Sequence, residues 1–223
     1  MTAPARSEPH LIAVSVGKPR EVLWQGKPLV TGIFKSPVEG RVAVGPLGLE
    51  GDGQADLTVH GGVDKAVYAY DAHGTAYWRS QLGRPELGPG CFGENLTWTG
   101  LPEGQVFIGD RFRIGSACFE VSQPRQPCIK LAKRFEDAGF PKRFLESRRV
   151  GCYLRVIEPG DVGAGDPIER VAHDPASLDV ASLVALFVAR TPNEAELERA
   201  VGLTALADAW RIPLRERLEA RRG

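Results

Sequence analysis

The pattern of hydrophobic residues changes once along this chain, near His173. Before that residue, short apolar runs rich in β-branched residues alternate with turns that contain glycine, a pattern typical of β-strands. After it, apolar residues between Leu178 and Phe187 recur at helical spacing, and Thr191-Pro192-Asn193-Glu194 matches a capping box with proline at the first helical position. The sequence therefore predicts a strand-rich body followed by a helical tail that is too small to bury a large core of its own.

Turns and caps predict several individual elements. Gln25-Gly26 lies between apolar residues at 22–24 and 29–30, which favours a β-hairpin. Asp71 and Gly83 flank residues 72–82 as the N-cap and terminator of a helix. Further expected elements are strands at 11–16, 41–44, 66–70, 153–157 and 168–171, a β-meander from 106 to 121, a turn at 160–165, and short helices at 129–135, 142–148, 203–210 and 213–221.

Composition argues against several functional classes. The 28 Lys and Arg residues are balanced by 28 Asp and Glu residues, so the chain has no overall field that would recruit nucleic acid or an anionic membrane. The four cysteines, at positions 91, 118, 128 and 152, form no C-x-x-C pair, which argues against zinc ribbons and clustered iron–sulfur ligands. The start lacks the apolar core of a secretory signal, and no apolar run approaches the length of a membrane span. We therefore expect a cytoplasmic protein with reduced thiols and a flexible leader over residues 1–10.

The segment around Cys128 is the strongest candidate for chemistry. Residues 122–135 contain four cations and no acid, so positive charge gathers around one thiol in a chain with no net charge. Cations, together with the start of the helix expected at residue 129, favour the thiolate, which is the form that ligates metals or attacks electrophiles. Pro124 and Pro127 restrict the backbone near the sulfur. The alternative is a structural cysteine in an ordinary strand-to-helix loop.

Two other polar clusters fall in expected loops. Residues 45–64 are rich in glycine and charge, and His60-Gly61-Gly62 could bring a ligand against bare backbone, because glycine permits close approach. The second cluster, Phe92-Gly93-Glu94-Asn95, places a carboxylate and an amide beside a glycine turn. Each has a plain alternative: glycines that only serve tight turns, a His60 on the surface or at a cap, and loop residues of a common type.

The order of these segments along the chain and the residues in them resemble one known family. They read Gly-Leu-Glu-Gly-Asp at 48–52, Val-His-Gly-Gly at 59–62, Phe-Gly-Glu-Asn-Leu at 92–96, Ile-Gly-Asp at 108–110, and Val-Ser-Gln-Pro-Arg-x-Pro-Cys-x-Lys at 121–130. This set resembles the MOSC domain, most closely the stand-alone bacterial branch in which a small three-helix domain follows MOSC. The resemblance implies a mainly β, barrel-like MOSC domain with short helices over residues 11–172 and a small all-α domain of three helices over residues 174–223.

The resemblance also implies a cofactor and an activity. MOSC domains of this kind are associated with a molybdenum cofactor (molybdenum–pterin) and with reducing N-hydroxylated compounds, including N-hydroxylated base analogues, to amines. The family's cysteine, which matches Cys128, is the protein ligand to molybdenum, and a soft thiolate suits a metal already held by dithiolene sulfurs. The expected contacts that follow are Arg125, Lys130 and Lys65 on the pterin's phosphate, Glu94, Asn95, Gln123 and Phe92 on the pterin, and His60 as a donor to an oxo group or as the acid that protonates the leaving oxygen.

The same residues leave alternatives open. Electrons have to come from a separate reductase, because the chain has neither cluster ligands nor a dinucleotide-binding glycine fingerprint. A carrier or storage module would hold the cofactor or its sulfur without turnover, and a third hypothesis is metal-free thiol chemistry at Cys128. A homodimer is also left open.

Two positions depart from the family pattern. Val63 stands where proline is common, and Cys91 stands where a small apolar residue is usual. Cys91 is interpreted as a small buried filler or, alternatively, as a second thiol that modulates the site. Cys118 and Cys152 fall in expected strands and are predicted to lie in the core.

Overall fold

The computed structural model describes residues 8–55 and 61–222. Its main element is a sheet of eight strands in the order β13-β9-β10-β11-β7-β8-β1-β4. A second sheet joins three strands in the order β12-β5-β6, and β2 and β3 form a separate hairpin. The strands are β1 (His10–Val16), β2 (Arg20–Trp24), β3 (Lys27–Thr31), β4 (Ser36–Pro37), β5 (Arg41–Gly45), β6 (Gly48–Leu49), β7 (Val67–Asp71), β8 (Leu96–Thr99), β9 (Arg111–Ile114), β10 (Ala117–Pro124), β11 (Cys152–Glu158), β12 (Gly160–Gly163) and β13 (Ile168–Ala172).

The large sheet curves but does not close into the expected barrel. Within the described residues, the start of β13 approaches β1 through an isolated bridge between His10 and Pro167. Three backbone hydrogen bonds accompany the bridge: Leu11 N to Asp166 O at 2.9 Å, Gly165 N to Leu11 O at 2.7 Å and Ile168 N to Pro9 O at 2.9 Å. This contact is limited to the few residues around the bridge, and no continuous ladder of described residues joins β13 to β1. Because a helix also connects two parallel strands, the fold is mixed α/β rather than mainly β, and the expected barrel is not closed; the expected short helices and the helical tail are present.

Helix α1 (Ala72–Leu82) connects the parallel strands β7 and β8. Its caps are the predicted ones: the Asp71 carboxylate accepts a hydrogen bond from His73 N, and Gly83 adopts a left-handed conformation with φ of 60°. A parallel pair needs such a crossover, and it aligns the starting ends of β7 and β8. Strand β8 was not expected from the sequence, because its four residues directly follow a glycine loop and show no longer pattern.

Four short helical segments lie between the strands of the body. They are η1 (Val63–Lys65), η2 (Glu103–Gln105), α2 (Ile129–Phe135) and α3 (Phe140–Glu146). Helix α2 has the predicted bounds. Helix α3 begins two residues before its predicted start, because Phe140 and Phe144 are fully buried and pack on Trp78 of α1, with ring centroids 4.9 and 5.7 Å away. The residues expected as a turn at 160–165 include strand β12.

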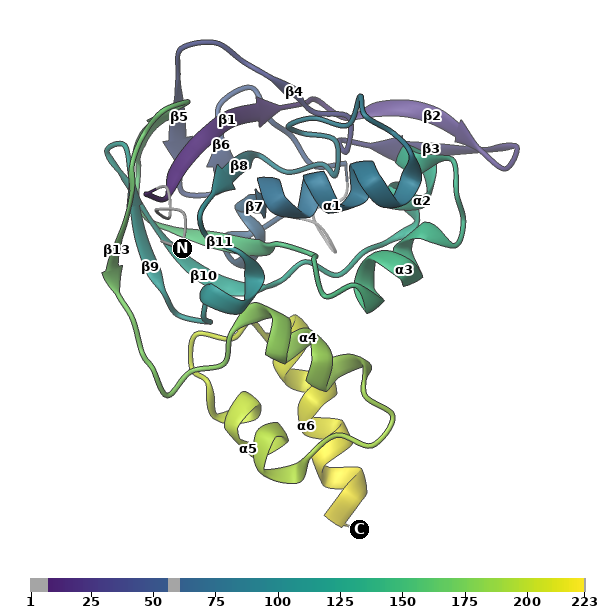
Figure 1. Cartoon of the computed structure of the whole chain (residues 1–223), viewed down its shortest axis with the longest axis vertical. Coiled ribbons are helices and arrows are strands. Elements are labelled where there is room, and N and C mark those ends of the chain that lie inside the picture. The colour runs from purple at the N-terminus through teal and green to yellow at the C-terminus, as the bar shows by residue number, and fades with distance from the viewer. Residues whose placement is uncertain (1–7, 56–60, 223) are drawn as a thin grey trace, which may run out of the picture.

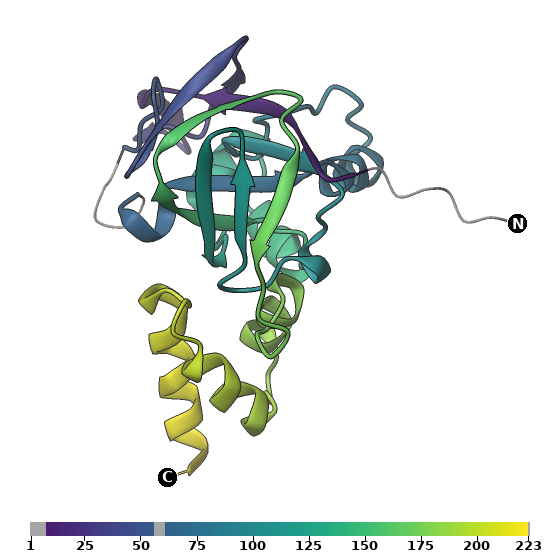
Figure 2. The same ribbon diagram turned by 90° about the vertical axis from the view of Figure 1, so that its left-hand side faces the viewer.

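Three helices follow the last strand and lie together beneath the sheets (Figures 1 and 2). They are α4 (Val180–Val188), α5 (Glu194–Gly202) and α6 (Asp208–Arg222). Helix α5 is capped by Asn193, two residues later than the predicted capping box implies. Helix α6 replaces the two short helices expected there and runs through Pro213, because Trp210, Leu214 and Leu218 bury one face at a spacing of four residues.

The helical tail is joined to the body by a shared core. Ile108 N donates to Leu178 O at 3.0 Å, and Arg155 Nη1 on β11 donates to Ala205 O at 2.7 Å. Buried side chains of α4, α5 and α6 belong to the same hydrophobic cluster as those of the sheet. The expectation that the tail does not bury a core alone therefore agrees with the packing.

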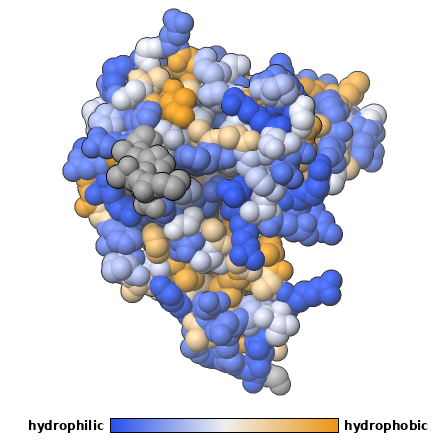
Figure 3. Space-filling view, viewed as in Figure 1, coloured by the Kyte–Doolittle hydropathy of each residue, from blue (hydrophilic) through white to orange (hydrophobic). Residues whose placement is uncertain are grey.

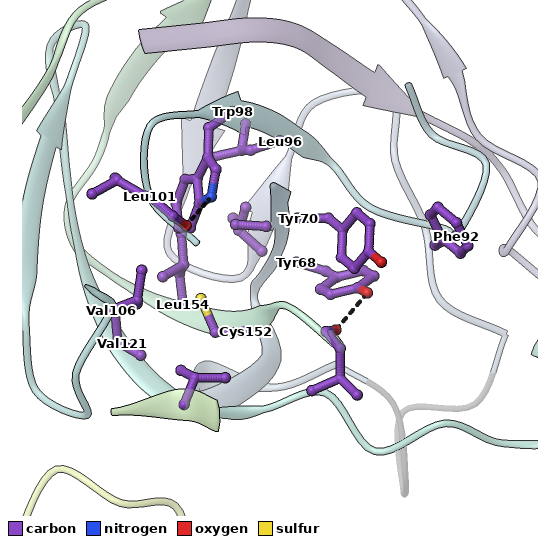
Figure 4. Close-up of a cluster of buried hydrophobic side chains, with 14 of the residues drawn as sticks. Tyr68, Tyr70, Phe92, Leu96, Trp98, Leu101, Val106, Val121, Cys152 and Leu154 are labelled. Carbon is purple, nitrogen blue, oxygen red and sulfur yellow. Dashed lines mark hydrogen bonds between the residues drawn. The ribbon is translucent and has the colours of Figure 1, made fainter. Parts of the chain in front are cut away.

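Figure 4 shows the part of this core that lies beside the candidate site. Tyr70 on β7 packs on Phe92 with ring centroids 4.7 Å apart. The hydroxyl of Tyr68 donates to Val150 O at 2.8 Å, so this buried polar group is satisfied. The site is consequently built on a rigid aromatic layer rather than on loops alone.

The surface in the view of Figure 3 is mostly hydrophilic, with hydrophobic side chains in small patches, some of them at the junction of the body and the helical tail. Among the described residues, none of the helices has both the length and the apolar character needed to cross a membrane.

Candidate functional site

A pocket lies where the starting ends of β7 and β8 meet the end of β10. Its cavity measures about 80 Å³ and is partly open to solvent. Five segments that are far apart in the sequence contribute to it: the stretch after β3, the loop after β6, η1, the loop before β8, and the loop between β10 and α2. The described residues that line it are Thr31, Gly32, Ile33, Lys35, Gly53, Gln54, Ala55, Gly61, Lys65, Tyr68, Phe92, Gly93, Asn95, Arg125, Gln126, Cys128, Lys130 and Tyr153.

Neighbouring strands supply the aromatic wall of the pocket. Tyr153 on β11 is paired with Tyr68 on β7, and their ring centroids are 5.3 Å apart. Tyr68 N donates to Asn95 Oδ1 at 3.1 Å, which fixes the loop before β8 against β7. Because these residues belong to paired strands, the wall is set by backbone hydrogen bonding.

Cys128 lies on the loop that leads from β10 into α2, where it is the N-cap residue of the helix and half-buried. The loop is anchored before the cysteine. Ser122 Oγ donates to Asp64 O at 2.5 Å, and Arg125 N donates to Gly151 O at 3.2 Å. These bonds hold the segment before the sulfur against η1 and the start of β11. They agree with the restricted loop that Pro124 and Pro127 predict.

Arg125 is a buried cation in the pocket wall. It is 5% exposed, and its guanidinium carbon lies 5.5 Å from the ring centroid of Tyr68 and 5.4 Å from that of Phe144. Burial opposes the charge, but Tyr68, Tyr153 and Cys128 outweigh it and raise the pKa of the guanidinium, so Arg125 stays protonated. Its Nη1 has no hydrogen-bond partner among the described residues. A buried donor without a partner is costly, which makes it available to an acceptor on a ligand.

The described lining carries positive charge only. Lys35, Lys65, Arg125 and Lys130 line the pocket, and none of the described lining residues is a carboxylate. Burial lowers the pKa of the Lys65 ammonium, while Asp64 and Cys128 partly offset the effect. Such a lining favours a ligand with acidic groups.

A buried ion pair at the edge of the pocket was missed by the sequence analysis. Lys35 Nζ lies 2.5 Å from Asp52 Oδ2, and the two side chains are 8% and 2% exposed. Asp52 also accepts from Gly17 N and from Asn95 Nδ2, each at 2.9 Å. Asp52 belongs to the Gly-Leu-Glu-Gly-Asp segment noted in the sequence, but nothing in the sequence connects Lys35 to it.

Most of the predicted contact residues lie together in this pocket. Phe92, Asn95, Lys65, Arg125, Lys130 and Cys128 all line it. Glu94 and Gln123 are fully buried and are not among the lining residues. Glu94 accepts from Gly90 N and Phe92 N, at 2.7 and 2.9 Å, so its carboxylate closes its own loop instead of facing a ligand. The predicted acid His60 lies outside the described residues.

The three other cysteines belong to the core. Cys91, Cys118 and Cys152 are each less than 5% exposed. Burial raises the pKa of the Cys91 thiol, which is the behaviour of the buried filler. Cys91 is not among the described residues that line the pocket, although the next residue, Phe92, is. The alternative of a second thiol at the site therefore finds no support in the described residues.

Comparison with known proteins identifies the family. The model of the MOSC domain matches residues 56–169. The chain belongs to the MOSC family. It is 39% identical over 201 residues to the uncharacterized protein YflK of Bacillus subtilis, covering 90% of each chain, and 35% identical over 198 residues to the protein YiiM of Escherichia coli, covering 86% of each. MOSC domains are associated with binding of the molybdenum cofactor.

A solved structure and a further sequence relative each match nearly the whole chain. The crystal structure of YiiM from Geobacillus stearothermophilus superposes with a TM-score of 0.79 at 33% identity, covering 94% of this chain and 99% of that one. A fungal relative from Gibberella moniliformis, named "Reductase", is 30% identical over 96% of this chain, which spans 36% of that protein's length. The helical tail is thus included in both matches.

Proposed function

We propose that this protein is a molybdenum-cofactor-dependent reductase that converts N-hydroxylated compounds to amines with electrons from a separate reductase. The observation that carries the proposal is the pocket in which the Cys128 thiol meets four cations and an aromatic wall. The relative named "Reductase" supports an oxidoreductase rather than a structural role.

The residues present fit a metal that brings most of its own ligands. Among the described residues, no group of three or more His, Cys, Asp and Glu side chains could hold a metal ion. One thiol on an anchored loop suits a metal whose other ligands are the sulfurs of a pterin.

Unpartnered polar atoms near the pocket support the same group. Arg125 Nη1 and Gln123 Oε1 are buried and have no partner among the described residues. In the proposed holoenzyme, Cys128 would ligate molybdenum, and Arg125, Lys65 and Lys130 would hold the acidic end of the pterin. Phe92 and Tyr68, which line the pocket, would offer aromatic surface to the bound group. The bound cofactor supplies two-electron redox chemistry at the metal.

Electron delivery is assigned to a partner protein. The four cysteines include no cluster motif, and the chain has no dinucleotide-binding glycine fingerprint. Reduction of an N-hydroxylated amine consumes two electrons and two protons and gives the amine and water. The electrons therefore come from a flavin or iron–sulfur protein that docks near the pocket.

The test uses protein made in a host that synthesises the cofactor. Metal analysis and turnover of an N-hydroxylated base with an artificial electron donor are measured for the wild type, Cys128→Ala and, as the matched control, Cys91→Ala. We expect molybdenum and turnover in the wild type and in Cys91→Ala, and the loss of both in Cys128→Ala. Molybdenum without turnover would favour the carrier module, and full turnover by Cys128→Ala would refute the proposal.

A further inference from the structure

The stretch after β3 places a lysine in the wall of the pocket. Lys35 follows Thr31, Gly32 and Ile33, which all line the same cavity. Its backbone is held by a bond from Lys35 N to Ile33 O of 3.0 Å. The carbonyl of Lys35 packs on the turn at Gly90, where an added Cβ would lie 2.9 Å from that oxygen. The side chain therefore starts from a fixed position and is 8% exposed.

The Lys35 ammonium has more N–H donors than acceptors among the described residues. An ammonium has three N–H donors, and the described residues supply one acceptor, Asp52 Oδ2 at 2.5 Å. Asp52 is itself fixed by Gly17 N and Asn95 Nδ2. A buried ammonium that lines a pocket with two N–H groups unassigned is placed to donate to a bound ligand.

The ion pair is not a good additional site for a phosphate. The charge of Lys35 is balanced by Asp52 at contact distance, whereas Arg125 lines the same pocket with a donor that lacks a partner. An acidic ligand group therefore binds more strongly to Arg125 than to Lys35, whose charge Asp52 already balances. A proton donor, in contrast, needs a nearby carboxylate that keeps the ammonium protonated until it is used.

Resting on the proposed function, we propose that Lys35 is the catalytic acid that gives its proton to the N–O oxygen of the substrate. The N–O bond breaks with two electrons from the flavin or iron–sulfur donor. The oxygen leaves as water, carrying its own hydrogen and the Lys35 proton, and the nitrogen takes the second proton from solvent. Lys35 is then reprotonated from solvent, so the lysine is unchanged over the cycle.

The electrostatic surroundings agree with this role. Burial lowers the pKa of Lys35, while Asp52 and Glu94 act in the opposite direction. An ammonium whose pKa is lowered is a stronger acid than an exposed lysine. The other titratable groups that line the pocket are Lys65, Tyr68, Arg125, Cys128, Lys130 and Tyr153.

The test measures single turnover by the holoenzyme after chemical reduction, with two substrates. One is an N-hydroxylated base, and the other is its O-acetyl ester, whose acetate leaves without a proton. Lys35→Met should slow the hydroxylated substrate by about 100-fold or more, because general acid catalysis contributes on that scale. It should leave the ester within about threefold of wild type, and the metal content unchanged. Lys35→Arg should be as slow as Lys35→Met, since a guanidinium keeps its proton. Lys27→Met, at the exposed hairpin turn, is the matched control.

The outcomes separate this inference from the proposed function. Equal slowing of both substrates, rescue by arginine, or loss of molybdenum from Lys35→Met would overturn the acid role and leave the reductase in place. A molybdenum-loaded wild type that reduces neither substrate would overturn both. If Lys35→Met is unstable because Asp52 is left unpaired, the double variant Lys35→Met/Asp52→Asn removes that buried charge, and the same difference between substrates is expected.

Discussion

Glu103 provides a test of the fold that does not depend on activity. This residue begins η2 and is 6% exposed, in a small cavity bordered by β7, β8, β11 and α4. Burial raises the pKa of its carboxyl to about 7, from an ordinary value of 4.5, and nearby Asp71 adds to the rise. A hydrogen bond from Gly151 N and the charge of Arg149 act in the opposite direction without cancelling it.

The sign of the effect on stability follows from proton binding. The folded protein holds the Glu103 proton up to about pH 7, whereas the unfolded chain releases it near pH 4.5. Because the folded state binds more protons between these values, the free energy of unfolding falls as the pH rises through this window. Between pH 5 and pH 8, the ionisation of Glu103 therefore lowers the free energy of unfolding by about 2.5 kcal/mol.

Replacing Glu103 with glutamine should abolish this contribution. Glu103→Gln keeps the shape and an acceptor for Gly151 N, but it does not ionise. Between pH 5 and pH 8, wild type should therefore lose about 2.5 kcal/mol more than the variant, which corresponds to about 5–10 °C in melting temperature for a chain of this size. The measurement is urea unfolding followed by tryptophan fluorescence at both pH values, with Glu39→Gln, at an exposed position, as the control. Identical pH dependence in wild type and Glu103→Gln would refute the reasoning.

Three further predictions concern the site and its support. Iodoacetamide should modify Cys128 well before Cys91, because only Cys128 is partly exposed; peptide mapping of the native protein measures this, and faster labelling of Cys91 would contradict it. Arg125→Met should reduce the molybdenum–pterin content by at least about tenfold, since a charge-assisted hydrogen bond is worth about 1.5–3 kcal/mol; an unchanged content would remove Arg125 from the cofactor site. Gly151→Ala should lower the free energy of unfolding by about 3 kcal/mol or more, because φ is +66° and the new Cβ would lie 2.3 Å from Ala69 O; denaturation by urea would expose the error if the variant were as stable as wild type.

Local signals in the sequence were reliable where one residue type satisfies one backbone requirement. Asp71 and Gly83 cap α1 as predicted, and the hairpin turns at Gln25 and Gly26, both with positive φ. The same reasoning misplaced the start of α5 and divided α6 at Pro213. Helix α5 starts later because the Asn193 side chain, rather than Thr191, accepts the capping hydrogen bond, from Glu196 N. In α6, burial of one helix face outweighs the unfavourable backbone position of Pro213.

The candidate site was predicted in part. Cys128, Arg125 and Lys65 could be identified because the chain concentrates unusual residue types in a few short segments. Lys35 and Tyr153 were missed, since each is an ordinary residue in the sequence: strand pairing brings Tyr153 to the pocket, and the stretch after β3 brings Lys35 there. Glu94 carried a strong motif signal but serves its own loop, since both its oxygens accept hydrogen bonds there.

By itself, the sequence determined the strand-rich body, the helical tail, the caps of α1 and the segment around Cys128 as the candidate site, because these depend on neighbours along the chain. Only the tertiary structure decided that the sheet does not close into a barrel, that the tail shares the core of the body, and that Lys35 lines the cavity of Cys128 as an ion pair with Asp52. The physical reason is that burial and strand register depend on residues distant in the sequence, and no local pattern records them.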